Sequence, residues 1–370
     1  MSNTRTTFLA DVHLGNPKRH GGPTKIGVNW RGELVMRAFE WALSRRAGHY
    51  VICGDLFDSS HPPAQLIERA AAALRKTQPS RATVLCGNHD QVSGLPKDNA
   101  VGCLWPNAYP VDGEPLVVKR RHHPLTLVPF RPGPAKTWLP EVLDRASKDD
   151  MSGTILCIHL GISDEETVGY LSGSNDSVSV DLLRELCDWH GFEAVVAGNW
   201  HEHRVWDIDV DGGDGRIVQV GATAPTGFSN PGHDDYGWVS HWDGSMFEHE
   251  RVPGPRFVVM EGPLDAQDLR EKMDPVNQYF IEGRCQPHDA QEVREVLEEM
   301  HATLDHVEAW SLRVVRPEAR AKAREAAKAA RAAETLEEAV RAFVAGMELK
   351  EGVEPKEVLE LAAGYLKGDG

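Results

Sequence analysis

Five apolar runs of this chain end directly in residues that could bind metal ions. These residues are Asp11, His13, Asp55, Asn88, His159, His201 and His203. Carboxylate and carboxamide oxygens mixed with imidazole nitrogens favour first-row ions such as manganese, iron or zinc over a purely oxygen-liganded calcium or magnesium site. A two-metal site needs about three to five protein ligands per ion, with one carboxylate shared between the ions. The residue types and their number therefore predict a two-metal centre.

The most informative segment covers residues 84–90. A short apolar run, the right length for a buried strand, stops at a glycine and is followed at once by Asn88, His89 and Asp90. Unpaired polar groups are costly to bury, so a buried strand that ends in such a cluster normally ends at a site. Taken alone, the segment also fits an ordinary Gly-Asn turn.

The surrounding elements explain how these side chains could meet. The sequence predicts strands at 6–14, 49–53 and 83–86, and helices at 32–46 and 62–76. Strands that alternate with helices indicate α/β layering. Ligands of such sheets lie beyond the carboxyl ends of the strands, and the polar clusters fall there.

The later part of the chain also contains apolar runs of strand length and a segment with helical spacing of apolar residues. We expect strands at 154–158, 194–197, 217–220 and 237–242, a helix at 181–189, weaker β-like runs at 115–119 and 125–129, and an exposed loop at 15–30. A proline-containing segment at 253–255 suggests a linker. Beyond it, residues 279–315 alternate strand, helix and strand. Two amphipathic helices, 336–347 and 355–367, close the chain and have apolar faces that are small for independent folding.

Composition limits the class of protein. The chain has 370 residues, 41% hydrophobic and 26% charged residues, as expected of a globular protein. We find no apolar run of membrane-spanning length and no leader-like start, and therefore expect a cytoplasmic protein with no membrane association. The six cysteines are widely spaced and predict reduced, packed thiols. A net charge of -16 argues against a protein that simply coats nucleic acid, but bound cations could still reverse the local field for a nuclease.

The spacing of these motifs resembles the calcineurin-like metallophosphoesterases. The motifs are Asp11-x-His13, Gly54-Asp55-x-x-Asp58, Gly87-Asn88-His89-Asp90, His159 and His201-x-His203. Within that superfamily, residues 54–63, 155–161 and 221–223 resemble the SbcD-type DNA double-strand-break repair exonucleases. The resemblance spans about the first 250 residues and implies a four-layer α/β sandwich of two β-sheets flanked by helices.

The resemblance also implies roles for individual residues. One ion would be held by Asp11, His13, Asp55 and His203, and the other by Asp55, Asn88, His159 and His201, so that Asp55 bridges the two ions. His89 would stabilise the transition state or protonate the leaving oxygen while an activated water attacks phosphorus in line. Asp58 and Asp90 could support the ligands from behind, or could be turn residues. The family pattern is Gly-His-x-His, whereas Asn199 and Trp200 separate Gly198 from His201 here.

By the same resemblance, the chain divides into three parts. Residues 1–250 would form the nuclease domain, 251–316 a small α+β domain that caps the site to select DNA, and 317–370 a helical segment that binds an SbcC-type ATPase. The implied activity is a manganese-dependent nuclease, an exonuclease on duplex ends and an endonuclease on single strands, acting in DNA repair and recombination. Residues 32–46 and 62–76 are candidate homodimer contacts.

Two other functions fit the sequence. One is a calcineurin-like phosphodiesterase or phosphatase on nucleotides or phosphoproteins, which would turn over small esters such as bis(p-nitrophenyl) phosphate without acting on duplex ends. The other is a scaffold that keeps the metal fold and acts through partner binding, which would keep its function after His89→Ala.

Overall fold

The structure is a computed structural model. It describes residues 5–17, 21, 24–25, 28–77, 82–92, 95–119, 124–146, 150–164, 175–210, 213–228, 237–262, 270–271, 273–314 and 344. The predicted helices at 336–347 and 355–367 lie outside these residues, apart from position 344, as does nearly all of the predicted partner-binding segment 317–370.

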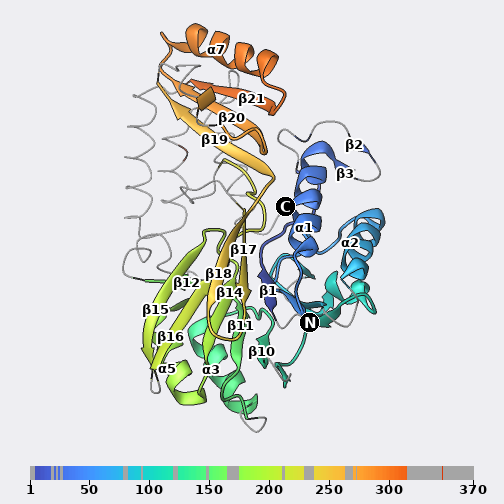
Figure 1. Ribbon diagram of the computed structural model, residues 1–370, viewed down its shortest axis with the longest axis vertical. Helices are drawn as coiled ribbons and strands as arrows, with labels where there is room; N and C mark the ends of the chain where they lie inside the picture. The colour runs from blue at the N-terminus through green and yellow to red at the C-terminus, as the bar shows by residue number, and fades with distance from the viewer. Residues whose placement is uncertain are drawn as a thin grey trace. The chain divides into compact units, whose positions relative to one another are not determined.

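Two helices separate the strands at residues 6–9, 49–52 and 82–85 (Figure 1). The helices are α1 (Trp30–Ser44), α2 (Ala64–Lys76), the 3-10 helix η2 (Val101–Leu104), α3 (Ala135–Ala146), α5 (Val180–His190) and α7 (Ala290–Thr303). The strands are β1 (Thr6–Leu9), β2 (Thr24–Lys25), β3 (Val28–Asn29), β4 (His49–Ile52), β5 (Ala82–Leu85), β6 (Gln91–Val92), β7 (Leu95–Asn99), β8 (Tyr109–Val111), β9 (Leu116–Val118), β10 (Leu125–Val128), β11 (Ile155–His159), β12 (Gly161–Ser163), β13 (Ser177–Ser179), β14 (Ala194–Gly198), β15 (Arg204–Val210), β16 (Gly213–Gln219), β17 (Gly237–Trp242), β18 (Phe247–Val252), β19 (Pro255–Glu261), β20 (Gln278–Cys285) and β21 (Val307–Val314).

Two six-stranded sheets organise these elements. The first has the order β18-β17-β1-β4-β5-β8, and the second has the order β15-β16-β14-β11-β10-β9. Strands β1, β4, β5 and β8 are parallel, as are β10, β11, β14 and β16. The carboxyl ends of the parallel strands in each sheet therefore meet at one edge, where the predicted polar clusters begin.

Three hydrophobic clusters reveal the layers. Side chains alternate across a strand, so neighbouring residues of β1 face opposite layers. Leu9 packs with residues of α1 and α2 such as Phe39 and Leu66. Phe8 instead packs with Val196 and other residues of the second sheet.

The third cluster joins the second sheet to α3 and α5, through residues such as Leu156, Leu139 and Leu183. The order helix, sheet, sheet, helix confirms the predicted four-layer α/β sandwich.

Most predicted elements have a counterpart, and the exceptions have physical causes. Helix α3 was missed because it contains Pro140, which usually interrupts a helix. The expected exposed loop at 15–30 contains the short β2–β3 pair, and Val28 is buried in it. The prediction of packed thiols was wrong for Cys103, which is exposed, whereas the other five cysteines are buried.

The chain divides into two compact units. One comprises Met1–Val258 with Asp274–Phe280, and the other comprises Val259–Met273 with Ile281–Gly370. The predicted strand, helix and strand beyond residue 278 are β20, α7 and β21, and β20 lies between β19 and β21 in a three-stranded sheet. Among the described residues, no helix combines the length and apolar character needed to cross a membrane.

Candidate metal centre

The loops after β1 and β4 run side by side and carry three of the predicted ligands. The backbone N–H of Asp11 donates to the Gly54 carbonyl (3.2 Å), and that of His13 donates to the Asp55 carbonyl (3.0 Å). These bonds continue the parallel pairing of the two strands past their ends. Asp11, His13 and Asp55 are thereby held at neighbouring positions on one rim.

The same three residues have left-handed backbones. The φ angles are 48° at Asp11, 49° at His13 and 49° at Asp55, and Asn199 has a φ of 79°. A left-handed conformation costs a non-glycine residue roughly 1–2 kcal/mol, and such residues cluster at functional sites. The backbone is therefore in an unfavourable conformation at the positions where the sequence predicted metal ligands.

One group of ligand atoms is formed by Asp11, His13 and His201. The Nε2 atoms of His13 and His201 lie 3.1 Å apart, and His201 Nε2 lies 3.9 Å from Asp11 Oδ1. Asp11 is fully buried, and His13 is only 7% exposed. Two imidazole nitrogens and a carboxylate oxygen that converge in this way suit a first-row divalent cation.

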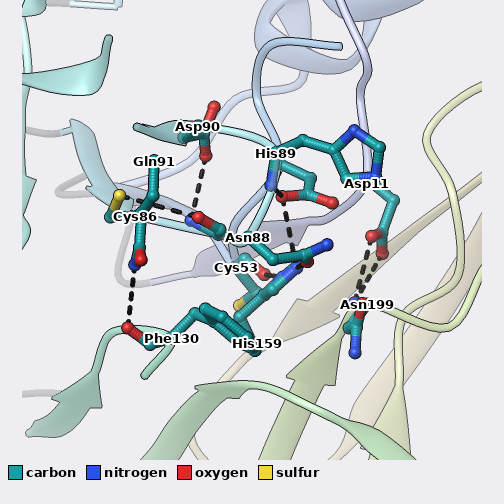
Figure 2. A network of polar contacts seen from close by, with 12 residues as sticks. Asp11, Cys53, Cys86, Asn88, His89, Asp90, Gln91, Phe130, His159 and Asn199 are labelled. Atoms are coloured by element: carbon teal, nitrogen blue, oxygen red, sulfur yellow. Dashed lines mark hydrogen bonds and ion pairs between the residues drawn. The ribbon is translucent and has the colours of Figure 1, made fainter. Parts of the chain in front are cut away.

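A second group is formed by Asp55, His159 and Asn88, with Asp11 also within ligand range of the first two. His159 Nδ1 donates to the Cys53 carbonyl (2.7 Å), so in the neutral ring Nε2 carries a lone pair. That nitrogen lies 2.9 Å from Asn88 Oδ1, a residue that Figure 2 labels beside His159, and 3.3 Å from Asp55 Oδ1. Three lone-pair donors face one another, an arrangement that a proton or a cation must satisfy.

The electrostatics of His159 agree with this geometry. Burial by itself lowers the pKa of His159, but the negative charge and hydrogen bond of Asp55 outweigh it and raise the pKa to about 9. Conversely, burial favours the neutral form of Asp55, but the charges of His159 and His13 hold its pKa well below the usual range. The site therefore favours positive charge beside an ionised Asp55.

Asp55 faces both groups through different oxygens. Its Oδ1 lies toward His159, and its Oδ2 lies 3.7 Å from His13 Nε2. Burial raises the pKa of the neighbouring Asp11, although the imidazoles of His159 and His201 oppose that shift. Cations would thus relieve the cost of burying two carboxylates at one rim.

Glycines allow the loops to approach this closely. A Cβ atom at Gly54 would lie 2.1 Å from His159 Nδ1, and a Cβ atom at Gly87 would lie 2.1 Å from Asp55 Oδ1. Gly54 also has a φ of 91°, a conformation that favours glycine. Both glycines of the predicted motifs are therefore needed for the packing of the ligand side chains.

Asp90 joins the two loops that carry Asp55 and Asn88. It is fully buried, and its carboxylate accepts hydrogen bonds from the backbone N–H groups of Phe57 (3.0 Å) and Gly87 (2.9 Å). Burial, reinforced by the charge of Asp55, raises the pKa of Asp90 to about 6. Asp58 lies on the other side of the first group, with Oδ1 3.4 Å from His13 Nδ1. Asp90 is placed to support ligands, whereas Asp58 also forms, with His13 and His89, a third group of side chains that could hold a metal ion.

His89 occupies the open side of the site. Its ring is exposed and packs edge-on against His13, with centroids 4.9 Å apart. The His89 backbone N–H donates to Asp55 Oδ1 (3.0 Å), and its Nδ1 lies 3.2 Å from the Asp58 carbonyl oxygen. The residue is therefore anchored at two points to the loop after β4, while its ring remains accessible.

His203 is the one predicted ligand that lies outside these groups. Its Nδ1 donates to the Val220 carbonyl (3.0 Å), and its ring stacks on Trp238 with centroids 4.6 Å apart. The ring of His249 lies 4.5 Å away, and burial lowers the pKa of His203. His201, which was assigned to the ion bound by His159, lies instead with Asp11 and His13.

Asn199 contributes through its backbone. Its N–H lies 3.0 Å from both oxygens of Asp11, and its side-chain amide donates to the Asp176 carbonyl (3.2 Å), as Figure 2 shows for the contact with Asp11. The sequence marked Asn199 only as a departure from the family pattern. The positive φ of Asn199 directs its N–H toward Asp11, and this angle could not be predicted from the sequence.

The family described as calcineurin-like phosphoesterase matches residues 4–204, and no curated protein matches the sequence.

Among solved structures, the phosphopantetheinyl hydrolase of Mycobacterium tuberculosis is 14% identical, with a TM-score of 0.38, and the match covers 60% of this chain and 91% of that one. A conserved protein of Streptococcus pneumoniae TIGR4, described as a predicted phosphoesterase, is 12% identical, with a TM-score of 0.32, covering 68% of this chain and 90% of that one. Similarity at this level does not transfer a substrate.

Proposed function

Since the chain belongs to the calcineurin-like phosphoesterase family, and is thus a phosphoester hydrolase of the metallophosphoesterase type, we propose that its substrate is DNA. In this proposal the protein is an SbcD-like nuclease that hydrolyses phosphodiester bonds with two divalent cations, most suitably manganese. The observation that carries the hydrolytic part is the convergence of donors from Asp11, His13, Asp55, His159 and His201 at one rim. The proposal of a DNA substrate rests on the amino-acid sequences of residues 54–63 and 155–161, which resemble the corresponding segments of the SbcD-type nucleases.

The geometry supports unequal ligation of the two cations. Asp11, His13 and His201, with Oδ2 of Asp55, would hold one cation. The other would be held by Oδ1 of Asp55, Asn88 and His159, again with Asp11 in range. This assignment leaves out His203. Two cations at such a site activate a water nucleophile and neutralise charge on the phosphate.

The protein side chains complete the chemistry. His89 is exposed beside His13, where its ring can reach a phosphate and, when protonated, donate a proton from Nε2 to the leaving oxygen. The contact of its Nδ1 with the Asp58 carbonyl orients the ring and leaves Nε2 for the substrate. Asp90 and Asp58 maintain the loop geometry on which the positions of the ligands depend.

The remaining parts of the molecule enter the proposal through sequence resemblance. We propose that 251–316 caps the site to select DNA and that 317–370 binds an SbcC-type ATPase, in the cytoplasm and in DNA repair and recombination. Homodimer contacts through α1 and α2 would use their outward faces, because their apolar faces pack on the first sheet.

The test is a nuclease assay on end-labelled duplex and single-stranded DNA. We expect loss of full-length DNA with manganese, less with magnesium and none with EDTA, and a large reduction for His89→Ala. Folded, manganese-loaded protein that hydrolyses bis(p-nitrophenyl) phosphate but leaves both DNA substrates intact would contradict the DNA substrate and favour a phosphodiesterase on small esters.

A further inference from the structure

His201 is held from the side opposite the predicted cation. Its Nε2 is directed toward Asp11 and His13, and its Nδ1 lies 3.2 Å from the hydroxyl oxygen of Thr226. A neutral ring that offers Nε2 as a ligand carries its proton on Nδ1 and can donate it to that hydroxyl. The backbone of His201 is fixed too, since its carbonyl accepts the Ala222 N–H (2.9 Å).

Thr226 is in turn held by Arg31 in the first turn of α1. The Arg31 guanidinium donates through Nη2 to the Thr226 carbonyl and lies over the ring of Phe257, 4.4 Å from its centroid. Arg31 is only 6% exposed, and its backbone N–H donates to the Gly21 carbonyl (3.1 Å). A buried arginine with these contacts has little freedom to move, so it fixes the loop that carries Thr226.

We propose that Thr226 is a positioning residue for His201 and that Arg31 fixes Thr226. This inference rests on the proposed metal centre and deepens it. The hydroxyl oxygen of Thr226 accepts the Nδ1–H of the neutral His201 ring and fixes the rotation of that ring, so that Nε2 meets a cation beside Asp11 and His13. The relation follows from contacts between residues that are far apart in sequence, and no motif includes either Thr226 or Arg31.

The experiment compares cobalt binding to full-length variants by calorimetry and by the visible spectrum of bound Co²⁺. Removing a partner that orients a metal ligand typically weakens metal affinity about 10- to 100-fold. We therefore expect Thr226→Val to weaken one class of Co²⁺ sites by about that factor and to change the spectrum. Thr226→Ser, which keeps the hydroxyl, should restore affinity to within about 3-fold of wild type.

A matched control is available within the same sheet system. Thr83 also contacts a histidine, with its hydroxyl 2.9 Å from His49 Nε2, but this pair lies within β4 and β5 rather than at the site. Thr83→Val should leave Co²⁺ binding unchanged. If Thr83→Val weakened Co²⁺ binding as much as Thr226→Val, the loss would reflect a general destabilisation of the fold, and the positioning role would be overturned. Wild-type Co²⁺ affinity in Thr226→Val would also overturn it. So would a Thr226→Ser protein whose Co²⁺ affinity stays as low as that of Thr226→Val.

The role of Arg31 is tested by a double-variant cycle. If Arg31 acts through Thr226, Arg31→Met weakens Co²⁺ binding and adds little to Thr226→Val when the two are combined. Effects that multiply, or an Arg31→Met protein that binds like wild type, would overturn this part. Wild-type protein that binds no Co²⁺ would instead overturn the metal centre itself, so the two failures are distinct.

Discussion

Two histidines that are two residues apart provide the sharpest test of the metal centre. His201 and His203 are equally plausible ligands by sequence, but only His201 has a ring nitrogen near Asp11 and His13. We expect His201→Phe to abolish tight binding of one cation and His203→Phe to leave binding intact. The two substitutions are chemically identical, so the difference between them isolates the position of the ring.

The magnitudes follow from the contacts. Loss of a residue that merely orients a ligand costs up to about 100-fold in metal affinity, so loss of the His201 donor itself should cost at least about 100-fold, or about 2.7 kcal/mol. Phenylalanine at 203 can keep the stacking on Trp238 and loses the hydrogen bonding of the imidazole, chiefly that to the Val220 carbonyl. That loss should lower the free energy of unfolding by about 1 kcal/mol and change manganese affinity less than about 3-fold.

Calorimetric titration with Mn²⁺ and elemental analysis of the dialysed proteins measure these quantities. Urea denaturation in EDTA shows whether each variant is folded. The reasoning would be refuted if His203→Phe lost manganese as severely as His201→Phe, because His203 would then be a ligand. Unchanged binding by His201→Phe would refute it equally.

Three further predictions concern the same rim. His89→Ala should lower kcat on DNA by about 10²- to 10⁴-fold, while elemental analysis finds the bound manganese unchanged; a parallel loss of metal would contradict a role in proton transfer. At pH 4 the folded protein holds Asp90 as a neutral acid, which resembles the amide of Asp90→Asn, so urea denaturation in EDTA should give the two proteins free energies of unfolding within about 1 kcal/mol of each other. Because the pKa of Asp90 is raised from 3.8 to about 6 in the folded protein, wild type alone loses stability as pH rises from about 4 to 6, so at pH 7 the Asp90→Asn protein should be the more stable of the two. Removal of cations by EDTA should lower Tm in a scanning calorimeter, and Mn²⁺ at 1,000 times its Kd should restore about 4 kcal/mol; an unchanged Tm would argue against cations bound to the folded state.

Much of the site could be predicted because of how parallel sheets are built. Asp11, Asp55 and His159 each follow or end a buried strand, and the strands run in the same direction within each sheet. This pairing brings Asp11 and Asp55 to one edge of the first sheet and His159 to an edge of the second, and the packing of the two sheets then places His159 beside Asp55. The alternation of strand and helix, together with apolar runs of strand length, was enough to expect the layers.

The arrangement of His201 and His203 could not be predicted in the same way. A His-x-His spacing places both rings on one side of an extended strand, but it does not show where the strand begins. In the structure β15 starts at Arg204, after a turn in which Asn199 is left-handed. That turn decides which ring faces Asp11, and it depends on tertiary contacts of the Asn199 backbone.

Thr226 and Arg31 could not be found from sequence for a different reason. Threonine and arginine are common residue types, and neither stands in a recognisable pattern here. Their contacts with His201 and with each other arise only when α1 and the segment after β16 pack together.

The left-handed backbones at Asp11, His13 and Asp55 have a consequence for the history of the chain under selection. Glycine, and to a lesser degree asparagine, would adopt these angles more easily. A laboratory population selected only for resistance to heat, with no demand for catalysis, should therefore accumulate such replacements at these three positions early. Such descendants should be more stable and should bind cations less tightly, because the replaced residues are the proposed ligands.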